Sequence, residues 1–273
     1  MNRIELAYII IQKLKFHEND IKISIKNSKN KIGYFYIDNL LPEKYVQNLF
    51  NVFPKTKNMI FKKSIREYKY VGIQLNDYDS LLEEIIYAFQ DDKIVNFMQK
   101  VFELNTVYPD PNLYAGGLSI MKKNNFLNPH IDNSHDKDIN KWRVLNLLYY
   151  VTPNWHIDYG GNLEIWSNGL KKRQTTIHSK FNRLVVMVTH NQSWHSVNPI
   201  KYNGRRCCIS NYYFSDSPIN NQNKFHVTSF RGRPNQKIYD VILQFDNYIR
   251  MFIRKFVKKG IAKQKHIYNK NKK

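Results

Sequence analysis

The chain contains little cysteine, few acidic residues and no long apolar run. Cys207 and Cys208 are the only cysteines among 273 residues, and an adjacent pair cannot form a disulfide framework, so we expect reduced thiols. No stretch approaches the roughly 18 apolar residues that indicate a membrane span, so no integral membrane segment is expected. Glu5 interrupts the apolar N-terminal segment and no small-residue cleavage site follows, so residues 3–16 are predicted as a surface helix and not a signal peptide. These features favour a cytoplasmic protein.

The shortage of acidic residues leaves a large positive charge. Lys and Arg number 43 against 22 Asp and Glu, a formal net charge of +21. Residues 231–273 carry 13 basic and two acidic residues, whereas residues 91–170 carry seven and nine. One interpretation of the basic C-terminal region is contact with a polyanion, such as nucleic acid, an anionic lipid or an acidic glycan. The other is a composition rich in Lys, Asn, Ile and Tyr whose charge is merely solvated, and both stay open.

The chain is long enough and apolar enough to bury a full core, with 42% apolar and 14% aromatic residues. Its first 105 residues predict mainly helices. Pro42 fits the first position of one helix, and Asp79 and Asp91 fit the N-caps of two more. Apolar residues recur at helical spacing after each start: Tyr45, Val46, Leu49, Phe50 and Phe53; Leu81, Leu82, Ile85, Ile86 and Phe89; and Ile94, Val95, Phe97, Met98, Val101 and Phe102.

From residue 113 to 214, short apolar runs alternate with turn residues, as in an antiparallel sandwich or barrel. Strands are predicted at residues 144–151, 162–166, 183–189 and 207–214. The C-terminal part then predicts a basic amphipathic helix whose apolar face we expect to pack on the sheet, with a membrane-surface role as the alternative. We therefore expect a helical support region at 1–105, a β-rich core at 106–216 and a basic helical extension at 217–273.

Two His-x-Asp pairs occur in the β-rich region. In a strand, residues i and i+2 point to the same face, so the two side chains of such a pair can bind one metal ion. His130 and Asp132 follow Pro129 and lead toward the long strands, which fits a strand end. His156 and Asp158 stand between turn residues, which predicts a hairpin loop without chemistry. We therefore select the first pair as candidate metal ligands.

A third ligand is available from His178, His190 or His195. His195 begins a strand, and Arg205 and Arg206 lie one hairpin further on, so antiparallel neighbours would place the metal and a guanidinium on one face. Two imidazoles and one carboxylate suit iron and leave three coordination positions open. A 2-oxo acid could occupy two of them and dioxygen the last. The distal carboxylate of 2-oxoglutarate calls for the planar, always-charged fork of an arginine.

At these residues the chain resembles the 2-oxoglutarate- and Fe(II)-dependent dioxygenases, and within them the prolyl-hydroxylase-like branch. The resemblance covers 85 residues in unbroken order, from 130 to 214, whereas the flanking regions match loosely. Its segments are His130-Ile131-Asp132-Asn133, Leu148-Tyr149-Tyr150-Val151, Tyr159-Gly160-Gly161-Asn162-Leu163-Glu164-Ile165-Trp166, Phe181-Asn182-Arg183-Leu184-Val185-Val186, His195-Ser196-Val197 and Arg206-Cys207-Cys208-Ile209-Ser210-Asn211-Tyr212-Tyr213-Phe214.

The resemblance implies an α+β, β-rich fold with a double-stranded β-helix (jelly-roll) core, N-terminal helices and a C-terminal basic amphipathic helix. It implies Fe(II), 2-oxoglutarate and dioxygen as cofactor and co-substrates, and allows ascorbate as a further cofactor. The residues it implicates are iron ligands and co-substrate contacts: His130, Asp132 and His195 for iron; Arg206, with Arg205 as the reserve, and Tyr150 for the distal carboxylate; and Leu148 and Val197 for the pocket wall.

The chain departs from the family pattern at two places. The interval from His195 to Arg206 is slightly longer than usual, which leaves the choice between Arg205 and Arg206 open. Ile120 and Met121 stand where some relatives carry a co-substrate tyrosine. Asp132 is retained, whereas the halogenases of the family replace it with a small residue, so hydroxylation is favoured over halogenation.

The expected reaction is hydroxylation of an unactivated C–H bond with release of succinate and CO2. The substrate is an amino-acid residue of a peptide, a small metabolite or a glycan, and the sequence does not choose among them. The alternative from another class is a jelly-roll binding module with a structural metal or none, whose basic tail holds a polyanion. A nucleic-acid demethylase gains no support, because the region around the candidate ligands is slightly acidic.

Overall fold

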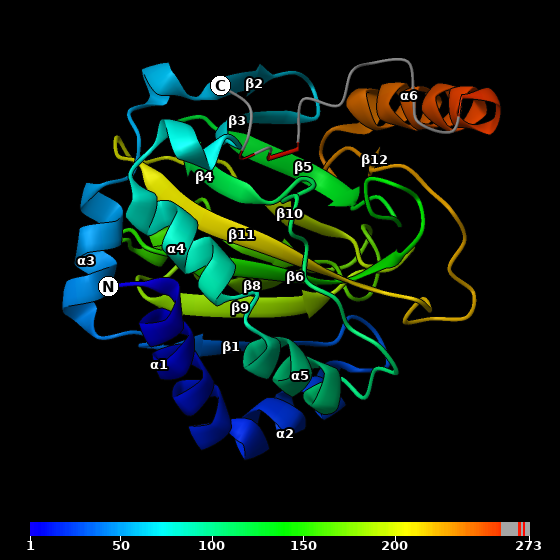
Figure 1. The fold of residues 1–273 in the computed structure, drawn as a ribbon. Helices are drawn as coiled ribbons and strands as arrows, with labels where there is room; N and C mark the ends of the chain where they lie inside the picture. Colours follow the sequence, from blue (N-terminus) through cyan, green and yellow to red (C-terminus); the bar gives the residue numbers. More distant parts are fainter. Residues whose placement is uncertain (258–266, 269, 271–273) are drawn as a thin grey trace.

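The computed structural model describes residues 1–257, 267, 268 and 270, and its strands form one curled antiparallel sheet (Figure 1). The strands are β1 (Tyr34–Asp38), β2 (Ile60–Lys63), β3 (Glu67–Gly72), β4 (Gly117–Met121), β5 (Phe126–Ile131), β6 (Trp142–Tyr150), β7 (Leu163–Ile165), β8 (Thr175–Ile177), β9 (Arg183–Val188), β10 (His195–Val197), β11 (Arg206–Ser215) and β12 (Ser229–Phe230). The helices are α1 (Arg3–Phe16), α2 (Glu18–Ser28), α3 (Glu43–Asn51), α4 (Ser80–Ala88), α5 (Asp92–Val101) and α6 (Lys237–Phe256).

The sheet has two halves that face each other. One half runs in the order β1-β9-β6-β11-β4, and the other runs β5-β10-β7-β8. Strand β3 pairs with both β4 and β5 and so joins the halves, while β2 pairs with β3 and β12 pairs with β5. Because side chains of both halves line one cavity, the curled sheet encloses a space between its layers. This is the jelly-roll core that the sequence predicts, and the prediction is confirmed.

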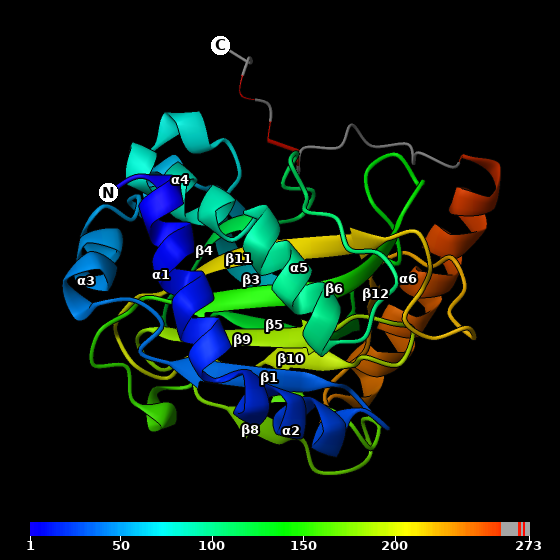
Figure 2. The same ribbon diagram turned by 60° about the horizontal axis from the view of Figure 1, so that its bottom comes forward.

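Helices α1, α4 and α5 cover the outer face of the first half (Figure 2). The predicted N-caps are both present, since the carboxylate of Asp79 accepts a hydrogen bond from the backbone N–H of Leu81 and that of Asp91 from Lys93. Pro42 is the residue before α3 and not its first helical residue. The predicted bounds of α1 are confirmed, and this helix buries five apolar side chains: Leu6, Ala7, Ile10, Ile11 and Leu14.

The N-terminal region also contributes strands, because β1 pairs with β9 and β3 pairs with the core strands. The four strands predicted in the β-rich region are present as β6, β7, β9 and β11, with ends that differ by at most two residues. The division of the chain at residues 105 and 216 stays a prediction. The final part of the predicted basic extension, residues 258–266, 269 and 271–273, lies outside the described residues.

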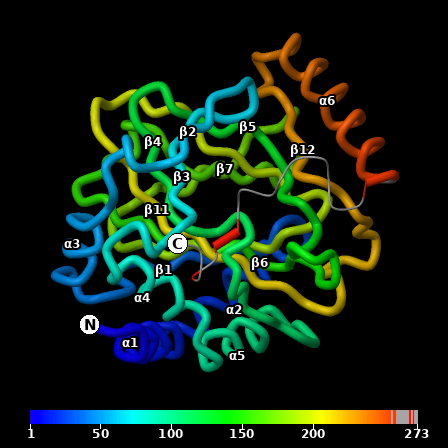
Figure 3. The backbone as a smooth tube through the Cα atoms, turned by 45° about the horizontal axis from the view of Figure 1, so that its top comes forward, coloured from blue at the N-terminus to red at the C-terminus, as the bar shows by residue number. Residues whose placement is uncertain are grey.

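The prediction that the apolar face of the C-terminal helix packs on the sheet is wrong. Phe245 of α6 is 65% exposed, and Leu243 is the one apolar side chain of this helix that is fully buried. The helix instead turns polar side chains toward the protein, where Asp240 pairs with Arg231 and Asp246 pairs with Arg66. Hydrogen bonds and ion pairs therefore fix its orientation, and they leave the apolar face outward. Figure 3 shows α6 at the periphery of the molecule. Within the described part of the chain, no helix combines the length and apolarity needed to cross a bilayer.

A glycine at the entrance to β7 gives a test of the fold. Gly160 has φ +76°, and a Cβ placed there would lie 2.1 Å from the carbonyl oxygen of Pro199. Gly169 has a similar φ of +81° but open space around it. We expect Gly160→Ala to lower the free energy of unfolding by about 3 kcal/mol or more, and Gly169→Ala by about 1 kcal/mol, because only the first adds a backbone clash to the strain. Urea unfolding measures both, and equal losses would contradict the clash.

Candidate metal centre

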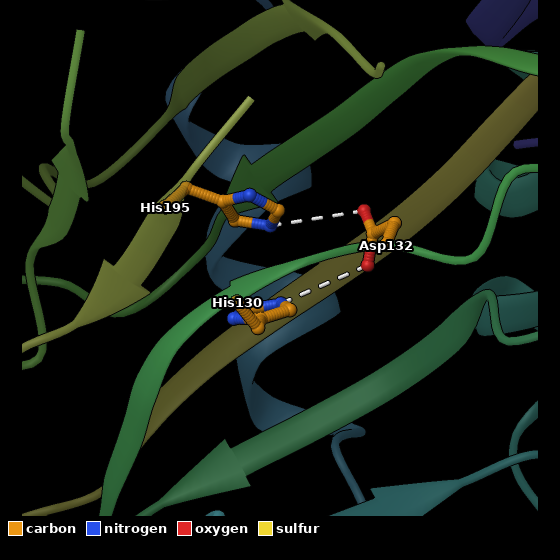
Figure 4. A group of neighbouring side chains, drawn as sticks. All are labelled: His130, Asp132 and His195. Carbon is orange, nitrogen blue, oxygen red and sulfur yellow. Dashed lines mark ion pairs between the residues drawn. The ribbon is translucent and has the colours of Figure 1, made fainter. Parts of the chain in front are cut away.

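Strand pairing brings the three predicted metal ligands together. His130 lies near the end of β5, and its partner across the antiparallel pair with β10 is His195. Asp132 follows β5 directly, two residues from His130, so its side chain turns toward the same face. His130 Nε2 lies 3.7 Å from Asp132 Oδ1, and His195 Nε2 lies 3.7 Å from Asp132 Oδ2 (Figure 4). One ligand atom from each residue lies within 4.8 Å of the others, a grouping that could hold a metal ion.

Backbone carbonyls orient both imidazoles. His130 Nδ1 lies 3.0 Å from the carbonyl oxygen of Asn128, and His195 Nδ1 lies 2.9 Å from that of Ser193. A carbonyl oxygen only accepts, so each Nδ1 carries the proton and each Nε2 presents its lone pair to the centre. Both histidines are buried. Burial and the neighbouring His195 imidazole lower the pKa of His130 to about 3, so its ring is neutral and able to coordinate at neutral pH.

The carboxylate of the group is also held in place. The amide of Asn146, on β6 of the opposite half, donates a hydrogen bond of 3.3 Å to Asp132 Oδ2. Burial alone would raise the pKa of Asp132, but the two imidazoles and the Arg143 guanidinium outweigh it and lower this pKa below its ordinary value. Asp132 is therefore an anion, which is the form that binds a cation.

The three side chains open into a cavity of about 560 Å³ between the two halves of the sheet. Alternate residues of β6 face it, namely Asn146, Leu148 and Tyr150. Val197 of β10 lines it from the other half, and so does Leu163 of β7. The predicted pocket residues Leu148, Tyr150 and Val197 therefore share one space with the candidate ligands.

The position of Arg206 distinguishes it from Arg205. Arg206 is 3% exposed, lines the cavity, and lies with its guanidinium carbon 5.3 Å from the centre of the Tyr150 ring. Arg205 lies outside the lining, where its guanidinium packs 4.5 Å from the Phe50 ring and donates to the Phe50 carbonyl oxygen. Successive residues at the start of a strand point to opposite faces, so only one of the two can reach the cavity.

Two buried polar atoms at this end of the cavity, one on Arg206 and one on Tyr150, lack hydrogen-bond partners among the described residues. Within the described residues, no hydrogen-bond acceptor meets Arg206 Nε and no partner meets the hydroxyl of Tyr150, although both atoms are buried. Arg206 Nη2 donates to the sulfur of Met121, at 2.9 Å. Buried polar atoms without partners are costly, and a carboxylate bound here would satisfy both.

One part of the predicted geometry is wrong. The sequence analysis placed His195 and the arginines on neighbouring antiparallel strands. In the structure β10 lies between β5 and β7, and β11 lies between β4 and β6, so the chain passes from one half of the sheet to the other between them. His195 and Arg206 meet across the cavity because the sheet is curled, and not through strand pairing.

The remaining candidate histidines take no part in the cluster. His156 begins a 3-10 turn with its side chain exposed and its ring packed edge-on against Tyr159, as expected for a loop residue. His178 Nε2 contacts the carbonyl oxygen of Trp155 at 2.7 Å. His190 Nδ1 accepts a hydrogen bond from the backbone N–H of Gln192 within the turn before β10.

Several supporting residues were not identified from the sequence. Asn146 could have been found, because it alternates with Leu148 and Tyr150 along one predicted strand. The contacts that support β10 could not have been found from the sequence. Glu164 accepts hydrogen bonds from Ser196 at 2.6 Å and from Arg233 at 2.7 Å. Arg233 comes from the C-terminal region and also donates to the carbonyl oxygen of Val197.

Arg143 at the start of β6 was also missed. It is buried, lines the cavity, and packs with its guanidinium carbon 3.9 Å from the centre of the Tyr212 ring. The sequence shows only an arginine at the start of an apolar run, and nothing local indicates that the side chain turns inward.

Comparison with known proteins agrees with this geometry. Residues 116–214 match the model of the 2OG-Fe(II) oxygenase superfamily. No curated protein sequence matches the chain. The match covers 99 of the 273 residues, and this segment is similar to the oxygenases of that superfamily, which use Fe(II), 2-oxoglutarate and dioxygen.

Solved structures show the same fold. A prolyl-4-hydroxylase from Pseudomonas putida is 12% identical with a TM-score of 0.54, and the match covers 72% of this chain and 100% of that one. A prolyl 4-hydroxylase from Phytophthora capsici is 18% identical with a TM-score of 0.51, covering 88% and 75%. A 2OG-Fe(II) oxygenase family oxidoreductase from Burkholderia pseudomallei is 11% identical with a TM-score of 0.51, covering 74% and 92%. At these identities the likeness is one of fold, and that fold is prolyl-hydroxylase-like.

The buried histidines predict how stability depends on pH. Burial, and then the nearby Arg143 guanidinium, lower the pKa of His135 to about 3, against about 6.5 in an unfolded chain. Between these values only the unfolded chain binds this proton. The contribution of His135 is therefore complete above pH 6.5 and is lost as the pH falls, by about 1.4 kcal/mol per pH unit.

Urea unfolding of the metal-free protein at about pH 7.5 and about pH 5.5 measures this dependence. We expect His135→Gln to reduce the difference between the two conditions by about 1.4 kcal/mol, since roughly one pH unit lies below the unfolded pKa. The control is His156→Gln, which alters an exposed imidazole and should keep the original difference. An unchanged difference in His135→Gln would show that this imidazole does not stay neutral in the folded protein.

Proposed function

We propose that this protein is an Fe(II)- and 2-oxoglutarate-dependent oxygenase that hydroxylates an unactivated C–H bond of its substrate, with His130, Asp132 and His195 as the ligands of Fe(II). The observation that carries the proposal is the buried arrangement of two imidazole Nε2 atoms and one carboxylate within 4.8 Å of one another. In the overall reaction, one oxygen atom of O2 is added to the substrate as a hydroxyl group. The second oxygen atom enters succinate, which forms as 2-oxoglutarate loses CO2.

The donor set fits ferrous iron. Two neutral imidazoles and one carboxylate occupy three positions of an octahedral ion and leave three for exogenous groups. When bound, the iron supplies the redox chemistry that activates dioxygen. The backbone carbonyls of Asn128 and Ser193 keep both Nε2 atoms pointed inward. Asp132 fills the position that a halide would need, which favours hydroxylation over halogenation.

The pocket beyond the ligands fits 2-oxoglutarate. We assign Arg206 to its distal carboxylate, because the guanidinium is buried and faces the cavity with a free Nε. The hydroxyl of Tyr150 is free to donate to the same carboxylate. Leu148 and Val197 form apolar walls that restrict how the co-substrate lies and exclude water beside it. Arg205 is assigned no role in binding.

The substrate is proposed as a peptide side chain, a small metabolite or a glycan. The relatives from Pseudomonas putida and Phytophthora capsici are prolyl hydroxylases, so prolyl peptides are the first class to test. A cytoplasmic location is part of the proposal, since Cys207 and Cys208 are buried and free. Ascorbate would serve only to keep the iron ferrous.

The decisive experiment is a succinate-formation screen with Fe(II), 2-oxoglutarate and, in turn, prolyl peptides, free amino acids and glycans. We expect succinate above the uncoupled background with one class, and mass spectrometry should find a gain of one oxygen in that substrate. His195→Ala should abolish both coupled and uncoupled turnover, because two ligands hold the ion poorly. His156→Ala removes an exposed imidazole outside the cluster and should keep full activity. A protein that binds Fe(II) yet never consumes 2-oxoglutarate would instead be the jelly-roll binding module.

The assignment of the carboxylate clamp has its own test. Arg206→Gln should raise the KM for 2-oxoglutarate by about 100-fold or more, because a buried charge-assisted pair is worth several kcal/mol. Arg205→Gln is the matched control and should leave this KM within about twofold, since Arg205 packs on Phe50 outside the cavity. Steady-state kinetics at varied 2-oxoglutarate concentration measures both KM values. A larger rise in KM for Arg205→Gln than for Arg206→Gln would assign the distal carboxylate to Arg205.

A further inference from the structure

The outward face of α6 is unusual because it is apolar. Its large side chains are between 42% and 78% exposed, and they follow helical spacing along one side: Ile238, Val241, Ile242, Phe245, Tyr248, Ile249, Phe252 and Phe256. The helix has 20 residues, so this stripe extends over about 30 Å. Single exposed apolar residues are ordinary, but a continuous stripe of this size indicates a surface that binds something.

The opposite face of α6 explains why the stripe points outward. Asp240 forms an ion pair with Arg231, Asp246 pairs with Arg66 and Arg250, and Asn247 donates to the carbonyl oxygen of Phe230. These contacts use both acidic residues of the helix on the side that faces the protein. The outward stripe is left without a negative charge.

Basic residues lie at both ends of this apolar stripe. At one end the exposed Lys237 begins α6, whereas Arg231 and Arg233 just before it are already paired with Asp240 and Glu164. Residues 257–273 add seven lysines and no acidic residue in the sequence. An uncharged apolar stripe between basic segments is the composition of helices that lie in the interface of an anionic bilayer.

We propose that α6 docks this protein on anionic lipid membranes, with its apolar stripe inserted at the level of the acyl chains and its flanking basic residues at the headgroups. Charge complementarity favours this occupant over a second copy of the chain. Each copy carries a formal charge of +21, so two copies repel, whereas an anionic surface attracts. Figures 1 and 2 both place α6 at the outer edge of the molecule, beside β12, where a flat surface can approach it.

Docking would also place the cavity close to the membrane. Arg250, Ile253 and Arg254 of α6 line the cavity that contains the candidate metal ligands. One side of the helix thus borders the oxygenase site while the other contacts lipid. The membrane interaction itself needs neither iron nor 2-oxoglutarate, so it is independent of the proposed reaction.

The test is co-sedimentation of the full chain with vesicles of phosphatidylcholine plus phosphatidylserine, and with vesicles of phosphatidylcholine alone. We expect binding to the first that weakens as salt is raised, and at least tenfold weaker binding to the second, roughly the effect of losing two lysine contacts. The double substitution Phe245→Gln with Phe252→Gln should weaken binding by about tenfold or more, because two aromatic side chains no longer insert. Both side chains are more than half exposed, so folding should be preserved.

The matched control is Tyr8→Gln with Phe16→Gln, which changes two exposed aromatic residues of α1. It should bind the vesicles like the parent chain. Absence of binding to phosphatidylserine vesicles at low salt would overturn the proposal, and so would equal binding by the α6 double variant. Light scattering that finds a dimer in the parent chain and a monomer in the α6 variant would assign the stripe to a second copy and overturn it as well.

Discussion

The antiparallel pairing of β5 with β10 is the contact on which the site depends. It sets His130 directly opposite His195, and the two-residue step to Asp132 then adds the carboxylate. A shift of one residue in this register would turn one imidazole to the other face of the sheet. Several contacts resist such a shift, because Glu164 on β7 holds Ser196, and Arg233 bridges Glu164 to the backbone of β10. A segment remote in sequence therefore secures the strand that carries one candidate ligand.

The curled sheet also keeps the Arg206 guanidinium and the Asp132 carboxylate apart inside one buried cavity. Arg206 lies at the end of the β6–β11 pair near Tyr150, whereas the Asp132 carboxylate lies beside Asn146, further along this pair. Burying either charged group without a partner would cost free energy of folding. Among the residues that the structure describes, none satisfies the Nε of Arg206 or the hydroxyl of Tyr150, and an anionic co-substrate would complete this end of the cavity.

The C-terminal helix shows how far local pattern and tertiary packing can diverge. Its apolar periodicity is real, and the helix exists with the expected stripe. The side that packs on the protein is nevertheless the polar one, because Asp240, Asp246 and Asn247 find specific partners there. Apolar periodicity identifies a helix with two unlike faces, but it does not say which face the rest of the protein covers. Arg66, which pairs with Asp246, lies 180 residues from it in the sequence, so a local pattern cannot predict this contact.

The sequence by itself determined four strands of the sheet, the N-caps at Asp79 and Asp91, and the choice of His130, Asp132 and His195 as candidate ligands of one metal ion. These features follow from periods of two and 3.6 residues, from capping chemistry and from the ligand preferences of metals, which all act over a few residues. The tertiary structure alone decided that Arg206 and not Arg205 faces the cavity, that β10 and β11 meet across the cavity and not side by side, and that α6 presents its apolar face outward. Those outcomes depend on where the sheet curls and on partners far away in the chain, and no local pattern records either.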